Sequence, residues 1–147
     1  MELKSARVLL TGACGGIGRA LLAELLARGA SVGMVDRRGV DLEEVASRYS
    51  GNGSRIQPIC ADITEGAGRD LIIRSMHERF GGVDILINNA GVLAFTEFAR
   101  HDPAAIEQMM RVNVTAPLVL SRSVLPGMIA RGHGRIVNIG SIFGSIG

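Results

Sequence analysis

The sequence predicts an α/β protein in which helices cover both faces of a parallel sheet. Short apolar runs alternate along the chain with stretches that have the period of a helix. The apolar runs are nearly continuous, as in parallel strands that are covered on both faces. A glycine-rich segment, TGACGGIG, joins the first run to the first helical stretch. We therefore expect one doubly wound domain over residues 1–147, with right-handed crossovers between its strands.

The first half of the chain divides into short strands and helices by its apolar spacing and its helix-ending residues. Leucines recur at helical spacing after Ile17 as far as Gly29, which we expect to cap that helix. Asp41 is expected to cap the next helix at its N-terminus. The expected strands are Arg7–Leu10, Ser31–Val35 followed by Asp36, and Arg55–Ala61, and the second helix is Asp41–Tyr49.

The second half continues the alternation with longer helices. Gly81 and Gly82 are expected to stop one helix, and the glycines at 132 and 134 are expected to end another. The expected elements are helix Glu65–Phe80, strand Val83–Ile87, helix Pro103–Arg131 and strand Arg135–Ile139.

Composition narrows the class of protein. The 147 residues are 47% hydrophobic, which favours a folded core over disorder. The net charge of +2 is scattered along the chain, which argues against a nucleic-acid or membrane surface. The two cysteines, Cys14 and Cys60, lack metal-ligand spacing, so we expect no metal site and a reducing compartment. With no signal or membrane-spanning pattern, we expect a cytoplasmic protein.

The glycine-rich segment is the first candidate site. It follows a strand and opens a helix, which is the context in which a glycine triplet binds a dinucleotide pyrophosphate at the helix N-terminus. The alternative is a tight strand-to-helix turn without a ligand. Cys14 is interpreted as a small loop residue, because the sequence places no base beside it. The candidate phosphate-binding residues are Gly12, Gly15, Gly16, Ile17 and Gly18.

Asp36 is the candidate for recognising the ribose of the nucleotide. It ends the second expected strand at about the 20-residue offset of an acidic ribose ligand. Its carboxylate would accept hydrogen bonds from the ribose hydroxyls of NAD and repel the 2′-phosphate of NADP. Arg37 is a second candidate, because a guanidinium can bind that phosphate bidentately. We therefore favour NAD and keep NADP as possible, and we interpret Arg38 as surface charge.

Several motifs in one order together resemble the short-chain dehydrogenase/reductase family. They are TGACGGIG, Asp62 in ICADI, NNAG at Asn88–Gly91, Asn113 in RVNVTAP, and IVNIGS ending in Ser141. The resemblance runs from Arg7 to the last residue. It implies a Rossmann-type sheet of five strands in this chain, in the order 3-2-1-4-5, and an NAD(P) cofactor.

The resemblance also implies roles for individual residues. Asp62 and Ile63 would contact the adenine, and the asparagines of NNAG would brace the central strand while Asn89, Ala90 and Gly91 line the ribose side of the cofactor. Two catalytic candidates remain. Ser141 would orient the reacting carbonyl or hydroxyl, although Gly140 stands where the family usually has a further serine. Asn113 would hold a proton-relay water through its main-chain carbonyl.

The sequence offers a physical reason for this role of Asn113. Pro117 lies one helical turn later and has no N–H group, so the Asn113 carbonyl would lose its helical partner in a kinked helix. The alternative is a helical asparagine at a bend without a catalytic role.

The family's tyrosine and lysine, in a YxxxK pattern, belong on the helix after Ser141. The single tyrosine here is Tyr49, which lies in another helix. We therefore expect residues 1–147 to be truncated before that helix and to be inactive alone. The last expected strand, with Ile136 and Val137, would then form an exposed apolar edge, which favours self-association.

These observations leave three functions to consider. The first is an oxidoreductase that transfers hydride between NAD(P) and a small carbonyl or alcohol substrate, as a homo-oligomer without nucleic-acid or membrane partners. The second is a non-catalytic NAD(P)-binding sensor or interaction module. The third is a flavodoxin-like domain, which the glycine-rich loop argues against. Whether the chain is an enzyme depends on its completion beyond Ser141.

Overall fold

The computed structural model describes residues 2–49, 51 and 55–141 of the chain. Within these residues, parallel strands form one sheet in the order β3-β2-β1-β4-β5, which confirms the predicted fold class and strand order. The chain passes from β3 at one edge to β4 on the other side of β1, so the strand order reverses beside β1. The strands are β1 (Arg7–Thr11), β2 (Ser31–Asp36), β3 (Ile56–Cys60), β4 (Ile85–Asn88) and β5 (Arg135–Asn138).

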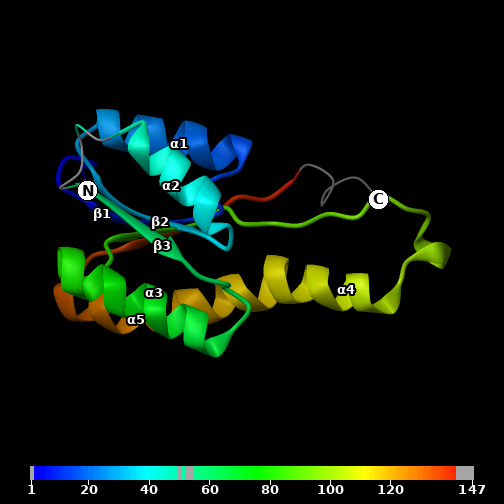
Figure 1. The fold of residues 1–147 in the computed structure, drawn as a ribbon. Helices are drawn as coiled ribbons and strands as arrows, with labels where there is room; N and C mark the ends of the chain where they lie inside the picture. The colour runs from blue at the N-terminus through cyan, green and yellow to red at the C-terminus, as the bar shows by residue number, and fades with distance from the viewer. Residues whose placement is uncertain (1, 50, 52–54, 142–147) are drawn as a thin grey trace.

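Helices cover the two faces of the sheet in separate pairs (Figure 1). One pair packs on one face and the second pair packs on the other. The first pair is α1 (Gly16–Ala27) and α2 (Gly39–Ser47), and the second is α3 (Gly66–Phe80) and α5 (Ala116–Arg131). Ahead of α5 come the 3-10 turn η2 (Phe98–Arg100), α4 (Pro103–Met110) and the π-helical segment η3 (Arg111–Thr115).

The strand side chains alternate between two apolar layers. In β1, Val8 and Leu10 pack with α1 and α2, whereas Leu9 packs with α3 and α5. All three side chains are fully buried, and burial of one such side chain is worth about 1.5–3 kcal/mol. This two-sided burial explains why the strands read as unbroken apolar runs.

Most predicted helix ends are confirmed, but the start of α2 is not. Gly29 and Gly81 adopt left-handed φ values of 84° and 78°, as expected of glycines that end helices. The predicted cap at Asp41 was wrong, because α2 begins at Gly39 and Arg38 is its N-cap residue. Asp41 lies in the first turn, where its charge is favourable to the helix dipole.

The expected helix 103–131 is continuous but contains a π turn, which includes Asn113. The Ala116 N–H donates to the Arg111 carbonyl, one residue further back than in an α-helix. Pro117, which has no N–H, follows this turn. The sequence did not predict this π turn, and the kink and the water-binding role of the Asn113 carbonyl stay predictions.

The same 29-residue helix contains an 18-residue window with a mean hydropathy of 1.2, so it is long and apolar enough by composition to cross a membrane. In this fold, however, its buried positions, among them Leu120 and Val124, pack in the core beside the sheet. A core helix of an α/β domain passes the same composition test, so this helix is weak support for a membrane span.

Strand β5 lies at the edge of the sheet with little cover, as the sequence predicts. Val137 and Ile139 are each 39% exposed, whereas the residues of the neighbouring strand β4 are buried. Self-association through this edge stays a prediction.

Candidate functional site

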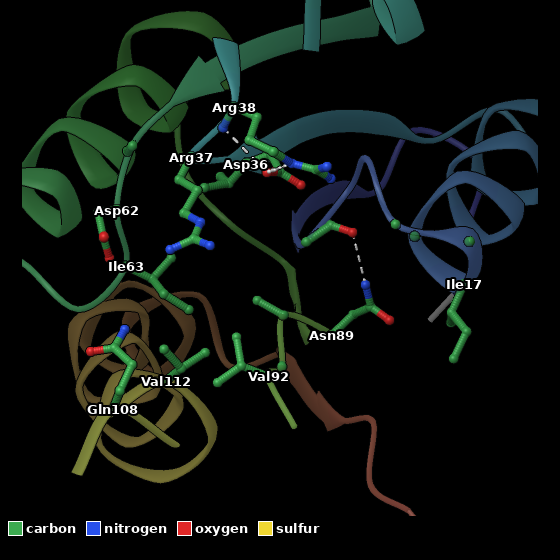
Figure 2. Close-up of a pocket in the computed structure, with 18 residues that line it drawn as sticks. Ile17, Asp36, Arg37, Arg38, Asp62, Ile63, Asn89, Val92, Gln108 and Val112 are labelled. Atoms are coloured by element: carbon green, nitrogen blue, oxygen red, sulfur yellow. Dashed lines mark hydrogen bonds and ion pairs between the residues drawn. The ribbon is translucent and has the colours of Figure 1, made fainter. Parts of the chain in front are cut away.

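A cavity of about 380 Å³ opens at the carboxyl ends of the strands, beside the reversal of strand order at β1 (Figure 2). This is the place where open parallel sheets bind ligands. The sequence-predicted nucleotide-binding residues, from separate loops, all line it: Gly12, Gly15, Gly16, Ile17, Gly18, Asp36, Arg37, Asp62, Ile63, Asn89, Ala90 and Gly91.

The glycine-rich loop combines tightly packed positions with an open one. Gly12 has a φ of +65°, and a Cβ on it would lie 2.8 Å from the Ala90 Cα. A Cβ on Gly18 would lie 2.1 Å from the Gly12 carbonyl oxygen, so helix α1 packs directly on the turn. A Cβ on Gly16 would meet no atom within 4 Å. The fold itself therefore requires Gly12 and Gly18, whereas Gly16 leaves space at the loop surface.

The N-terminus of α1 is suited to an anionic group. Its N-cap residue, Gly15, provides no side-chain hydrogen bond, and the first turn of α1 contains no acidic residue. The first amide groups of a helix lack partners within the helix and carry the positive end of its dipole. With glycines at the turn, this helix end can bind a phosphate group through backbone N–H groups.

Thr11 and Asn89 join the end of β4 to the glycine-rich loop. The Thr11 hydroxyl accepts hydrogen bonds from the amides of Asn89, at 3.0 Å, and Ala90, at 3.1 Å. The Asn89 side-chain amide donates to the carbonyls of Thr11, at 3.0 Å, and Gly12, at 3.1 Å. These bonds hold the Asn89–Gly91 segment against the loop, where both line the cavity. Thr11 was not among the predicted site residues.

Asn88 braces β4 on the opposite side. Its side-chain amide donates to the Asn138 side-chain oxygen at 2.8 Å, which ties β4 to β5. The bracing role that the resemblance implied for the NNAG asparagines is thus confirmed.

Asp36 lies at the end of β2 with both carboxylate oxygens hydrogen-bonded. Oδ2 accepts from the Cys14 amide at 3.2 Å, and Oδ1 lies 3.3 Å from the Arg38 amide nitrogen and 3.4 Å from its Nε. Arg38 is exposed, in agreement with its interpretation as surface charge, but it also lines the cavity and pairs with Asp36. Arg37 extends in another direction, across the cavity towards Ile63 (Figure 2).

Asp62 provides a second carboxylate, at the end of β3. Its Oδ1 accepts from the Thr64 amide at 2.8 Å and from the Thr64 hydroxyl at 2.7 Å. The hydroxyl hydrogen bond lowers the pKa of Asp62 most, and the charge of Arg37 contributes further. Asp62 is therefore ionised at neutral pH and acts as a hydrogen-bond acceptor at the cavity.

The Cys14 thiol is unreactive in this loop, in agreement with its interpretation from the sequence. Burial, with the nearby Asp36 charge, raises the pKa of Cys14 to about 11. The thiol stays protonated at neutral pH, and only the thiolate is an effective nucleophile.

The two catalytic candidates lie outside the lining of this cavity. The Asn113 side chain is exposed and forms two hydrogen bonds to the Val92 backbone, accepting at 2.9 Å and donating at 2.8 Å. It therefore fastens η3 to the segment that follows β4. Ser141 is exposed and lies just after β5. Their catalytic roles stay predictions.

The cavity has walls that the sequence did not reveal. Most of these additional residues are apolar, with one amide and one guanidinium side chain. They come from the ends of β2 and β3, the segment after β4, and the helical stretch that contains α4 and η3. Periodicity assigns such residues to the core, and their position at a cavity depends on tertiary packing. The additional lining residues are Val35, Arg38, Ala61, Val92, Gln108 and Val112.

A parallel sheet in this order, with a glycine-rich loop before α1 and an acidic residue at the end of β2, defines a dinucleotide-binding fold of the Rossmann type. Comparison with known proteins then identifies the family. A family model described as short chain dehydrogenase matches residues 6–147, and the chain belongs to this family.

Individual relatives have a similar sequence and fold. Fatty acyl-CoA reductase Rv0547c of Mycobacterium tuberculosis is 38% identical over 144 residues, which cover 95% of this chain and 48% of that protein. 2-(S)-hydroxypropyl-CoM dehydrogenase 3 of Xanthobacter autotrophicus is 35% identical over 146 residues, covering 99% and 57%. The crystal structure of a gluconate 5-dehydrogenase from Burkholderia cenocepacia in complex with NADP and tartrate has a TM-score of 0.88 and 32% identity, covering 99% of this chain and 57% of that one. The chain thus spans about half the length of the relatives it matches.

Proposed function

We propose that this chain binds NAD(P) in the cavity and forms the dinucleotide-binding part of an oxidoreductase. The complete protein would transfer hydride between NAD(P) and a small carbonyl or alcohol substrate. One observation carries the proposal: a single cavity combines a glycine-rich loop, an uncapped helix N-terminus and two carboxylates at separate strand ends. The loop and the helix N-terminus suit the pyrophosphate and Asp36 suits the ribose, and the family resemblance assigns Asp62 to the adenine.

Each part of the cavity suits one part of the cofactor. The N-terminus of α1 would hold the pyrophosphate, and the absence of a side chain at Gly16 leaves room for it. Asp36 would accept hydrogen bonds from the adenosine ribose, and Asp62 from the exocyclic amine of the adenine, beside Ile63. The Asn89–Gly91 segment would line the nicotinamide ribose. The nicotinamide ring supplies the site that accepts or donates hydride.

The charge at the ribose end favours NAD. Asp36 is an acidic residue at the end of β2, where a 2′-phosphate would meet its charge. Arg37 also lines the cavity and could accommodate that phosphate, so NADP is the weaker alternative. The Burkholderia gluconate 5-dehydrogenase structure contains NADP, so a protein of this fold can hold that cofactor.

The chemical step would use residues beyond the cavity lining. Ser141 would donate a hydrogen bond to the reacting oxygen, and the main-chain carbonyl of Asn113 would hold a water that relays the proton. Neither group is an effective general acid. General acid–base catalysis is worth roughly 10²–10⁴-fold. Because no YxxxK pattern follows Ser141 here, we expect the 147 residues to bind cofactor but turn over very slowly.

The remaining proposals concern the substrate, the oligomeric state and the cellular compartment of the whole protein. We propose that it acts on small molecules, functions as a homo-oligomer and is cytoplasmic. Residues 1–147 would then form one dinucleotide-binding domain of a longer enzyme.

Isothermal titration calorimetry with NAD⁺ tests the binding proposal. We expect saturable binding that Asp36→Asn weakens about tenfold, because a hydrogen bond to a charged group is worth about 1.5–3 kcal/mol. Glu43→Gln is the matched control, since it removes an exposed carboxylate outside the cavity lining. No heat of binding at millimolar NAD⁺ or NADP⁺ would overturn the proposed function.

A further inference from the structure

Three charged side chains form a continuous ion-pair chain at the ribose end of the cavity. The Arg38 guanidinium lies 3.4 Å from Asp36 Oδ1 through Nε and 2.8 Å from Asp41 Oδ2 through Nη1. Arg38 is the N-cap residue of α2 and Asp41 lies in the first turn, so their i,i+3 spacing places them side by side. Asp36 and Arg38 line the cavity, whereas Asp41 is not among the lining residues.

In this group of ion pairs, Arg38 contacts two carboxylates, those of Asp36 and Asp41. The charges of Asp36 and then Asp41 raise the pKa of Arg38 further above its ordinary value. The side chain of Asp36 is 10% exposed, while that of Arg38 is 56% exposed, so Arg38 occupies the solvent side of the pair. Taken alone, these three side chains, two carboxylates and one guanidinium, carry a net negative charge.

Arg38 is also the cation that could reverse the cofactor preference. A phosphate monoester carries about −1.5 to −2 charges at neutral pH, and a guanidinium binds it bidentately. To bind the phosphate through Nη1 and Nη2, Arg38 would have to exchange the 2.8 Å contact of Nη1 with Asp41 for the ligand. Arg37 points elsewhere, towards Ile63, so the two arginines are not equivalent (Figure 2).

We propose that Asp41 determines cofactor specificity as a positioning residue: by holding Arg38 it withholds this guanidinium from a 2′-phosphate and keeps the ribose end selective for NAD. This inference rests on the proposed function and adds to it a residue outside the cavity lining. It also assigns a role to Arg38 as the cation that Asp41 neutralises. Without the Asp41 charge, Arg38 turns to a 2′-phosphate and the preference for NAD diminishes.

The test compares the dissociation constants of NAD⁺ and NADP⁺ by isothermal titration calorimetry. In Asp41→Asn we expect NADP⁺ to bind about tenfold more tightly than to the wild type, with NAD⁺ changed little, because one charge-assisted contact is gained. In the double variant Asp41→Asn/Arg38→Gln this gain should disappear. Asp41→Glu keeps a carboxylate beside Arg38 and should keep the wild-type ratio.

Glu97→Gln is the matched control, because it breaks an exposed i,i+3 pair with Arg100 and changes the net charge equally, away from the cavity. The inference would be overturned, and the proposed function left standing, by one result. This result is a ratio of the NAD⁺ and NADP⁺ dissociation constants in Asp41→Asn that equals the ratio in the wild type or in Glu97→Gln, with NAD⁺ still binding. A gain that persists in the double variant would also overturn it. Failure of both nucleotides to bind the wild type would overturn the proposed function instead. Circular dichroism of each variant verifies that the fold is retained.

Discussion

Asp84 is a nearly buried carboxylate on which two arginines and a histidine converge, at the end of the sheet opposite the cavity. Arg7 donates to it from its backbone amide, at 3.0 Å, and from Nε, at 2.8 Å, and also pairs with it through Nη2. Arg131 Nε and His133 Nε2 each lie 3.5 Å from Asp84 Oδ1. The cluster joins β1 and the residues before β4 to the end of α5, so it acts as a structural fastening.

The charge of Asp84 should therefore stabilise the fold in a pH-dependent manner. The Arg7 hydrogen bond lowers the pKa of Asp84 to about 2, from about 3.9 in an unfolded chain. Because the folded pKa is the lower one, this stabilisation is present above about pH 4 and is lost as the pH falls towards 2. We expect about 2 kcal/mol of unfolding free energy to disappear across this window.

Urea denaturation at pH 5 and pH 2.5 measures this loss. The wild type should lose more free energy of unfolding than Asp84→Asn, which has no titrating group at this position. Asp70→Asn, on an exposed position of α3, should behave like the wild type. If all three proteins lose the same free energy of unfolding between pH 5 and pH 2.5, the stabilising role of the Asp84 charge is contradicted.

At the scale of elements, the turn between β1 and α1 contains one glycine that the packing of the fold requires, Gly18, and one that leaves room for a ligand, Gly16. Gly18→Ala places a Cβ 2.1 Å from the Gly12 carbonyl oxygen, so the helix and turn must move apart. We expect a loss of at least about 1–3 kcal/mol, as for other overpacked sites. Gly16→Ala meets no atom within 4 Å and should leave the free energy of unfolding unchanged or slightly higher.

Chemical denaturation followed by circular dichroism compares these two variants. If Gly16 provides room for a pyrophosphate, Gly16→Ala should also weaken NAD⁺ binding in a protein of normal stability. A Gly16→Ala protein that is as destabilised as Gly18→Ala would show that the loop packs differently from the structure.

At the scale of the whole molecule, two exposed apolar features favour association with another chain. They are the edge strand β5 and the surface of helix α5. Val137 in β5 is 39% exposed, and Leu118 and Ile129 of α5 are 66% and 73% exposed. Uncovered strand edges and apolar patches favour pairing with another chain. We expect the 147-residue chain to self-associate with rising concentration.

Sedimentation velocity over a range of concentrations tests this expectation. Val137→Lys places a charge on the edge strand and should shift the distribution towards monomer. Val40→Lys is the control, because Val40 is 82% exposed on α2, which covers the face opposite α5. A wild-type chain that is monomeric at every concentration would contradict the prediction.

Prediction from the sequence succeeded where local spacing sets the structure. The spacing of Gly12, Gly16 and Gly18, between an expected strand and an expected helix, predicted the loop that the structure places at the cavity. Prediction failed for Asp41, because either an N-cap or a first-turn position is favourable for an acidic residue, and only the backbone distinguishes them. It also missed the π turn, because one residue of helical register decides between the α and π patterns.

The sequence by itself determined the α/β fold, the strand order through its family resemblance, and many but not all of the residues that line the cavity. Apolar periodicity and glycine spacing are local properties of the chain, so they predicted the elements and the glycine-rich loop. The strand order and the cavity residues after β3 and β4 followed from the resemblance. Only the tertiary structure decided that Arg38 joins Asp36 and Asp41, and that Gln108 and Val112 wall the cavity. Those contacts depend on side-chain directions and on packing between elements distant in sequence, which local spacing does not encode.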